Sequence, residues 1–172
     1  MNIKACLFDL DGVLVDTAHF HYLAWKQLAD KLGFQFTKAD NEQLKGISRT
    51  DSLDILLRIG RIEASAEEKK QYASEKNETY LNYIGKMTPN DVLPGVIDFL
   101  NELKSNSVLT GLGSASRNAR LILERTDLTE YFDAIVDGNI VTHAKPNPEV
   151  FFTGAQMLNV QSSFCIVFED AV

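Results

Sequence analysis

The sequence is poor in cysteine and proline and has no excess of positive charge. Two of its 172 residues are cysteines and four are prolines. Cys6 and Cys165 stand in apolar runs without the flanking pattern of a metal or redox motif, so we expect two buried thiols in a reducing compartment. Lys and Arg number 17 against 24 Asp and Glu, giving a net charge of -7, which argues against a nucleic-acid-binding surface.

Long apolar runs are also missing. No run approaches the roughly 18 residues that a helix needs to cross a bilayer. The apolar stretch at the N-terminus is too short for a signal peptide, and Asp9 interrupts it. We therefore expect a cytoplasmic, monomeric globular protein with no membrane or nucleic-acid partner.

What the sequence does contain is a series of short apolar runs separated by helical patterns. The runs predict strands at 3–8, 107–113, 134–137 and 164–168. Continuous apolarity over so few residues is typical of strands that are covered on both faces, as in parallel sheets. The alternation of strand and helix predicts an α/β fold with a doubly wound parallel sheet.

About a hundred residues separate the first two predicted strands, which is too many for one crossover. Most of this stretch shows helical patterns, with a capping box at Ser65–Glu68 and a stop at Gly85. We predict a helical domain over residues 18–87, inserted into a core formed by 1–17 and 88–172.

The last predicted strand is followed by only a few residues before Val172. No helix is available to cover this strand. We therefore expect that the C-terminal strands of the core are missing and that apolar surface is exposed beside the last strand.

Polar side chains follow the predicted strands at the edge where ligands bind in open α/β sheets. These polar residues are Asp9, Asp11, Ser114, Ser116, Lys145, Glu169 and Asp170, with Ala115 between the two serines. Carboxylates this close repel one another unless a cation joins them, and oxygen ligands suit Mg²⁺. A lysine and hydroxyl groups nearby suit a phosphoryl group.

Asp9 and Asp11 are the predicted catalytic pair. We interpret Asp9 as a nucleophile that attacks phosphorus and Asp11 as the general acid/base, with Gly12 allowing a sharp turn after them. A solvated acidic turn is the alternative interpretation, but it explains only the first of the strand ends. No role is predicted for His143.

These residues resemble the motifs of a known family. DLDGVLVDT at 9–17, GSAS at 113–116, Lys145-Pro146 and Glu169-Asp170 resemble, in order, the four motifs of the haloacid dehalogenase superfamily of phosphotransferases. The resemblance covers the whole chain. It implies a HAD-like core, and the insert after the first motif implies a member with a helical cap.

Residues of the predicted cap indicate which family within the superfamily the chain resembles. LKGISRTDS at 44–52, together with His21 and Trp25, is similar to the β-phosphoglucomutase family. This similarity implies an isomerase that interconverts β-D-glucose 1-phosphate and β-D-glucose 6-phosphate through an aspartyl-phosphate enzyme and a 1,6-bisphosphate. The metal ligands that it implies for Mg²⁺ are Asp9, the Asp11 backbone carbonyl, Glu169 and Asp170.

The resemblance also implies a substrate-binding set from the core and the cap. Its members are Asp11, His21, Trp25, Lys45, Gly46, Arg49, Ser52, Ser114, Ala115, Ser116, Arg117, Asn118 and Lys145. Arg49 is implied to hold the distal phosphate, for which a guanidinium is suited. On the residues alone, His21 and Trp25 can equally be packing residues, and Lys76, on a strongly charged helix, is expected on a solvated face.

Four other functions compete with the mutase. Hydrolytic dehalogenation is disfavoured, because that chemistry needs neither the second acid nor the metal. A sugar-phosphate phosphatase of the same fold would use the same Asp9 and Asp11. A phosphonate-cleaving relative would need a cap lysine for a Schiff base, and Lys45 is the candidate. A non-catalytic binding protein would have no need of the complete set of acids and Lys145.

Overall fold

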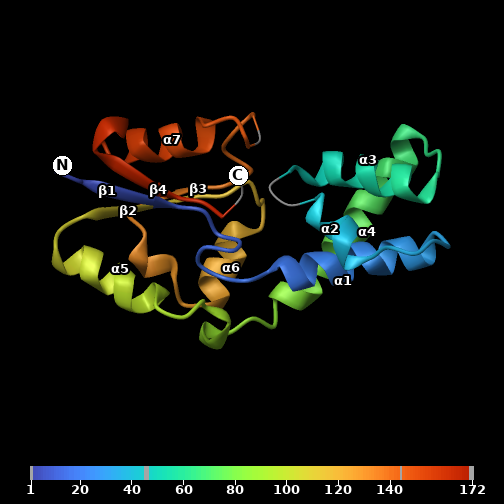
Figure 1. Cartoon of the computed structure of the whole chain (residues 1–172), viewed down its shortest axis with the longest axis horizontal. Coiled ribbons are helices and arrows are strands. Elements are labelled where there is room, and N and C mark those ends of the chain that lie inside the picture. Colours follow the sequence, from blue (N-terminus) through green and yellow to red (C-terminus); the bar gives the residue numbers. More distant parts are fainter. Residues whose placement is uncertain (1, 45–46, 144, 171–172) are drawn as a thin grey trace. The chain divides into compact units, whose positions relative to one another are not determined.

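The computed structural model describes residues 2–44, 47–143 and 145–170. The chain divides into two compact units (Figure 1). Unit 1 comprises Met1–Asp16 and Lys86–Val172, and unit 2 comprises Thr17–Gly85. The domain boundaries proposed above from the sequence alone, at 17/18 and 87/88, stay a prediction.

Unit 1 is built on a parallel sheet with the strand order β3-β2-β1-β4. The strands are β1 (Ala5–Phe8), β2 (Leu109–Gly113), β3 (Ala134–Val136) and β4 (Cys165–Phe168). The predicted α/β fold with a parallel sheet is confirmed. The strand expected from Ser107 starts two residues later, because Ser107 has a φ of 56° and its N–H donates to Lys104 O in the turn that ends the preceding helix.

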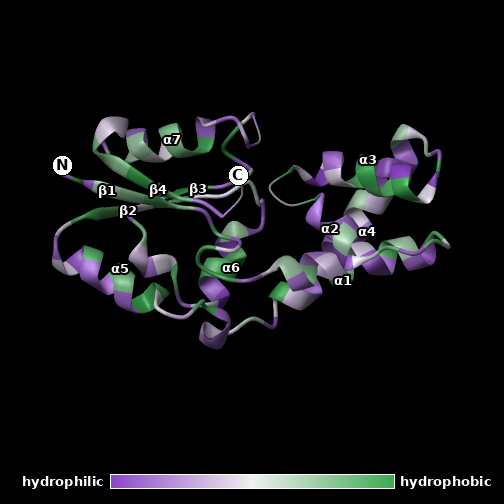
Figure 2. Ribbon diagram, in the orientation of Figure 1, coloured by the Kyte–Doolittle hydropathy of each residue, from purple (hydrophilic) through white to green (hydrophobic). Residues whose placement is uncertain are grey.

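Helices lie on both sides of this sheet, as a doubly wound fold requires (Figure 1). The helices are α5 (Val96–Ser105), α6 (Ala119–Arg125) and α7 (Glu149–Met157), with short 3-10 turns η1 (Pro89–Asp91), η2 (Thr129–Tyr131) and η3 (Ser162–Phe164). Hydrophobic and hydrophilic stretches alternate along α5 in Figure 2, which is typical of a helix with one buried side. Leu100 and Leu103 are its buried residues.

The sheet core is mostly apolar up to the point where the strands end, with Thr110 of β2 as a buried polar residue. All four residues of β1 are buried, and the ring of Phe8 stacks on Phe168 with 4.8 Å between centroids. Phe99 and Phe132 pack edge-on against Phe8. The exposure expected beside the last strand is present in β4, where Ile166 and Val167 are 41% and 44% exposed.

Unit 2 is helical, as predicted for this part of the chain. Its helices are α1 (Ala18–Lys31), α2 (Lys38–Glu42), α3 (Arg49–Gly60) and α4 (Ala66–Ile84). The predicted capping box is confirmed, since the Glu68 N–H donates to Ser65 Oγ and the Ser65 N–H donates to the Glu68 carboxylate. Among the described helices, none combines the length and the apolarity that a membrane span would need.

A compact apolar cluster holds unit 2 together. Its buried members are Trp25, Leu28, Ala29, Phe36, Leu44, Leu53, Leu56 and Leu57. They come from α1 and α3 and from the segments between them, so removing one side chain loosens the packing of several elements at once.

We expect Leu56→Ala to lower the free energy of unfolding by about 2–5 kcal/mol, because Leu56 is fully buried and its removal leaves a cavity. Urea unfolding followed by circular dichroism measures the change. Thr50→Ala on the same helix is the control, because Thr50 is exposed and should change stability by less than about 0.5 kcal/mol. Equal effects of the two substitutions would contradict the assignment of Leu56 to the core.

Candidate functional site

The register of two neighbouring strands places the first acids of the site side by side. Phe8 of β1 is paired with Phe168 of β4, and the Asp9 N–H donates to Phe168 O at 2.9 Å. Asp9 and Glu169 are the next residues on these parallel strands. Because parallel strands end at the same edge, both side chains leave the sheet at that edge.

Three carboxylates converge there. Oxygen atoms of Asp9, Glu169 and Asp170 lie within 4.8 Å of one another. Asp9 is buried, with 7% of its surface exposed, whereas Glu169 is half-buried and Asp170 is exposed. A set of hard oxygen ligands this close together fits a divalent cation.

Lys145 reaches the same acids from the loop before α7. Its Nζ is 2.7 Å from Asp9 Oδ1 and 2.5 Å from Glu169 Oε2. The ammonium also lies 4.9 Å from the centre of the Phe151 ring. Lys145 therefore supplies positive charge beside the acids, and its ammonium is suited to contact an anionic group bound there.

Burial controls the ionisation of Asp9. It raises the pKa of this carboxyl from 3.8 to about 7, against the lowering effect of Lys145. Asp11 and Glu169 add to the pKa increase through like-charge repulsion. The effect of burial exceeds that of the ion pair, so Asp9 needs further positive charge to stay ionised at neutral pH.

A tight turn at Gly12 leaves space for the carboxylate of Asp170. Gly12 has a φ of 82°, and its N–H donates to Val15 O at 2.7 Å. A Cβ on Gly12 would lie 2.2 Å from Asp170 Oδ2, so the Asp170 carboxylate packs directly against the glycine. Asp11, in the same turn, is half-buried.

The loop after β2 carries the predicted hydroxyl groups. Ser114 is buried, and its Oγ accepts a hydrogen bond from the Ser116 N–H at 3.1 Å. Ser116 Oγ in turn accepts from the Asn118 N–H at 3.2 Å. Both hydroxyl hydrogens can still be donated to a bound group. Arg117 is exposed, and Ala115 is partly exposed.

The other described residues of the predicted substrate set lie in unit 2. Trp25 and Ser52 are buried, with exposed fractions of 2% and 3%, whereas His21 and Arg49 are partly exposed. Lys45 and Gly46 fall outside the described residues. The substrate-binding roles of these residues stay predictions.

The expectation for Lys76 is wrong. It is 3% exposed, and its Nζ lies 3.0 Å from His21 Nδ1 and 4.6 Å from the ring centres of Trp25 and Tyr80. Burial lowers the pKa of His21 well below its usual value, and the charges of Lys76 and Arg49 lower it further. Helical spacing places Lys76 and Tyr80 on one side of α4, but the burial of Lys76 also depends on His21 and Trp25 of α1, which the sequence of α4 does not show.

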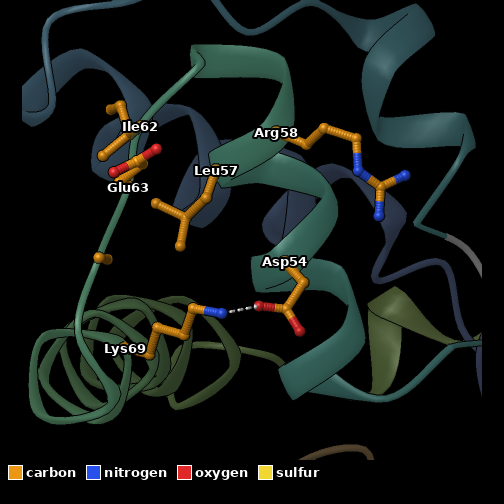
Figure 3. A pocket seen from close by; sticks show the side chains of 7 residues that line it. Asp54, Leu57, Arg58, Ile62, Glu63 and Lys69 are labelled. Atoms are coloured by element: carbon orange, nitrogen blue, oxygen red, sulfur yellow. Dashed lines mark hydrogen bonds and ion pairs between the residues drawn. The ribbon is translucent and has the colours of Figure 1, made fainter.

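A hollow on the surface of unit 2 does not involve these residues. It has a volume of about 420 Å³ and is lined by Asp54, Leu57, Arg58, Ile62, Glu63, Ala64 and Lys69. Figure 3 shows the ion pair between Lys69 and Asp54 at its side, with a distance of 2.7 Å. None of the residues that line it was predicted to take part in the chemistry.

Comparison with known proteins gives consistent matches. Residues 3–172 match the haloacid dehalogenase-like hydrolase family. The chain is 44% identical to the β-phosphoglucomutase of Bacillus subtilis, covering 98% of this chain and 76% of the relative. It is 31% identical to a phosphorylated carbohydrates phosphatase of Thermotoga maritima, covering 98% and 77%. The crystal structure of a β-phosphoglucomutase from Clostridium difficile has a TM-score of 0.93 and 46% identity, covering 98% and 77%.

We expect Gly12→Ala to weaken the binding of Mg²⁺, used as a probe cation, by about 10-fold or more, because the new Cβ displaces the Asp170 carboxylate. Isothermal titration calorimetry measures the affinity. Gly33→Ala is a matched control, since Gly33 also has a positive φ of 85° but no atom within 4 Å of the added Cβ. If both variants bound Mg²⁺ like the unsubstituted protein, the packing of Asp170 on Gly12 would have no part in the site.

Proposed function

The chain belongs to the haloacid dehalogenase-like hydrolase family, and we propose that its activity is that of a β-phosphoglucomutase. This enzyme interconverts β-D-glucose 1-phosphate and β-D-glucose 6-phosphate. The observation that carries the proposal is the buried Asp9 carboxylate, held by Lys145 beside Glu169 and Asp170. The 44% identity with a β-phosphoglucomutase supports this choice within the family.

The proposed reaction takes place in two halves. In the first half, an Asp9 oxygen attacks the phosphorus of the 1,6-bisphosphate, the ester P–O bond breaks, and Asp11 gives a proton to the leaving oxygen. When the 1-phosphoryl group is the one transferred, glucose 6-phosphate leaves. In the second half, the 6-hydroxyl of β-D-glucose 1-phosphate attacks the aspartyl phosphate, the bond between Asp9 and phosphorus breaks, and the hydroxyl gives its proton to Asp11. Asp9 is then free again, and a new bisphosphate has formed.

The residues around Asp9 have complementary roles in this proposal. Lys145 and Ser114 hold the oxygens of the phosphoryl group that is transferred. Asp9, Glu169, Asp170 and the Asp11 carbonyl would hold Mg²⁺, which when bound neutralises the acids and the phosphoryl charge. With this positive charge present, Asp9 remains a carboxylate in spite of its burial.

The second phosphate and the sugar need ligands of their own. We propose unit 2 as a cap that supplies Arg49 for the distal phosphate and His21, Trp25, Lys45, Gly46 and Ser52 for the sugar. From unit 1 we propose Ala115, Ser116, Arg117 and Asn118 for the distal phosphate. A cytoplasmic location and a monomeric state stay predictions.

A sugar-phosphate phosphatase is the second candidate. It would use the same Asp9 and Asp11 but pass the phosphoryl group to water. The 31% identity with a phosphorylated carbohydrates phosphatase favours it, but less strongly than the 44% identity favours the mutase.

³¹P NMR distinguishes these two candidates. With Mg²⁺, β-glucose 1-phosphate and a trace of the 1,6-bisphosphate, we expect glucose 6-phosphate to form without a matching amount of free phosphate. Asp9→Asn should abolish turnover, because the amide is not a nucleophile. Free phosphate alone would indicate a phosphatase, and unchanged activity of Asp9→Asn would disprove the role of Asp9.

The raised pKa of Asp9 predicts that protons compete with Mg²⁺. Below pH 7 the buried carboxyl is protonated in the metal-free protein, so lowering the pH from 8 to 6 should weaken Mg²⁺ binding by about 10-fold and binding should release a proton. Calorimetric titrations in two buffers of different ionisation enthalpy measure both quantities. Asp9→Asn should remove this pH dependence, and equal affinities at pH 6 and pH 8 in the unsubstituted protein would contradict the prediction.

A further inference from the structure

The carboxylate of Glu149 accepts hydrogen bonds from residues on the other side of Lys145 in the same loop. Oε1 of Glu149 accepts a hydrogen bond from the Thr142 N–H at 3.0 Å, and Oε2 accepts one from the His143 N–H at 2.8 Å. Thr142 Oγ1 donates to the same carboxylate at 3.1 Å, and His143 Nδ1 lies 2.8 Å from Oε2. Both oxygens of Glu149 are therefore engaged by the backbone and side chains of two consecutive residues.

The position of Glu149 makes these contacts a link between the loop and α7. Glu149 is the first residue of α7, and its own N–H donates to Asn147 Oδ1 at 3.0 Å. Thr142 and Glu149 are seven residues apart in the chain. Lys145 lies between them, and its ammonium is in contact with Asp9 and Glu169.

We propose that Glu149 is a positioning residue for Lys145, because its carboxylate ties Thr142 and His143 to the start of α7 and so fixes the loop from which Lys145 reaches Asp9. The inference rests on the phosphoryl transfer proposed above. Hydrogen bonds to a charged acceptor are stronger than neutral ones, and several of them hold this loop at once. The position of the Lys145 ammonium affects the rate, since a displacement of about 1 Å between a catalytic group and the reacting atoms can reduce the rate by about 100-fold.

The ionisation of Glu149 agrees with this role. The hydrogen bond from the Thr142 backbone is the largest cause that lowers the pKa of Glu149 to about 2, and the contacts with His143 add to it. The carboxylate therefore remains charged from about pH 4 upward. A helix-capping role alone does not explain the contacts, because Glu149 accepts from the preceding loop while Asn147 accepts from the first N–H of the helix.

The test uses acetyl phosphate as the phosphoryl donor with Mg²⁺ and follows the formation of phosphorylated Asp9 by mass spectrometry. We expect Glu149→Gln to lower this rate by about 10-fold, because the amide has only one acceptor oxygen and its NH₂ faces other donors. Lys145→Ala should lower the rate further, and adding Glu149→Gln to it should have no additional effect. A rate of Glu149→Gln within twofold of the unsubstituted rate, or the same fold-loss in the Lys145→Ala background, would overturn the proposal.

Two controls keep the test independent of general stability. Glu124→Gln makes the same change at an exposed position of α6 and should leave the rate unchanged. Thr142→Val removes one donor and keeps the carboxylate, so a loss of about 2- to 3-fold is expected even where Glu149→Gln does not fold.

Hydrogen exchange separates this proposal from the proposed mutase activity. In Glu149→Gln the Thr142 and His143 amides should exchange faster, and the amides of β3 should not. Unchanged exchange would show that Glu149 does not hold the loop, whatever the enzyme's substrate. Normal phosphorylation of Asp9 with no conversion of glucose phosphates would contradict the mutase alone.

Discussion

The burial of a carboxylate among other acids is the interaction on which the rest of unit 1 depends. Asp9 is almost inaccessible to water, and its carboxyl has a pKa of about 7 because burial outweighs the attraction of Lys145. A group in this state needs a positive charge close by in order to act as a nucleophile. Lys145 supplies one such charge, and the carboxylates of Asp9, Glu169 and Asp170 could bind a cation that supplies another.

Strand register brings these groups together. The pairing of Phe8 with Phe168, reinforced by the stacking of their rings, fixes the points at which Asp9 and Glu169 leave the sheet. The apolar layer and the charged edge therefore adjoin each other along the same two strands. Shifting the register of β4 by one residue would move Glu169 to the other face of the sheet.

Unit 2 also contains a buried charged residue, Lys76, whose surroundings differ from those of Asp9. The Lys76 ammonium lies over the faces of two aromatic rings and against the ring nitrogen of His21. The low pKa of His21 keeps the imidazole neutral, so that Nδ1 can accept the hydrogen bond from Lys76. These contacts join α1 and α4, so they are lost if either helix is displaced.

The sequence alone determined the parallel α/β fold, the helical character of the segment between the first two strands, and the strand ends at which Asp9, Lys145, Glu169 and Asp170 meet. Short apolar runs and the acids directly after them are local signals, and the parallel arrangement of strands brings such ends to one edge. Tertiary structure decided the burial of Lys76 and the role of Glu149. Both depend on contacts between residues whose side chains have ordinary surface character in the sequence, since Lys76 is buried by rings from α1 and α4, and Glu149 bonds to residues that lie beyond Lys145 in the same loop. The sequence pattern records which residues are apolar, whereas the partners of a charged side chain are settled only when the elements pack.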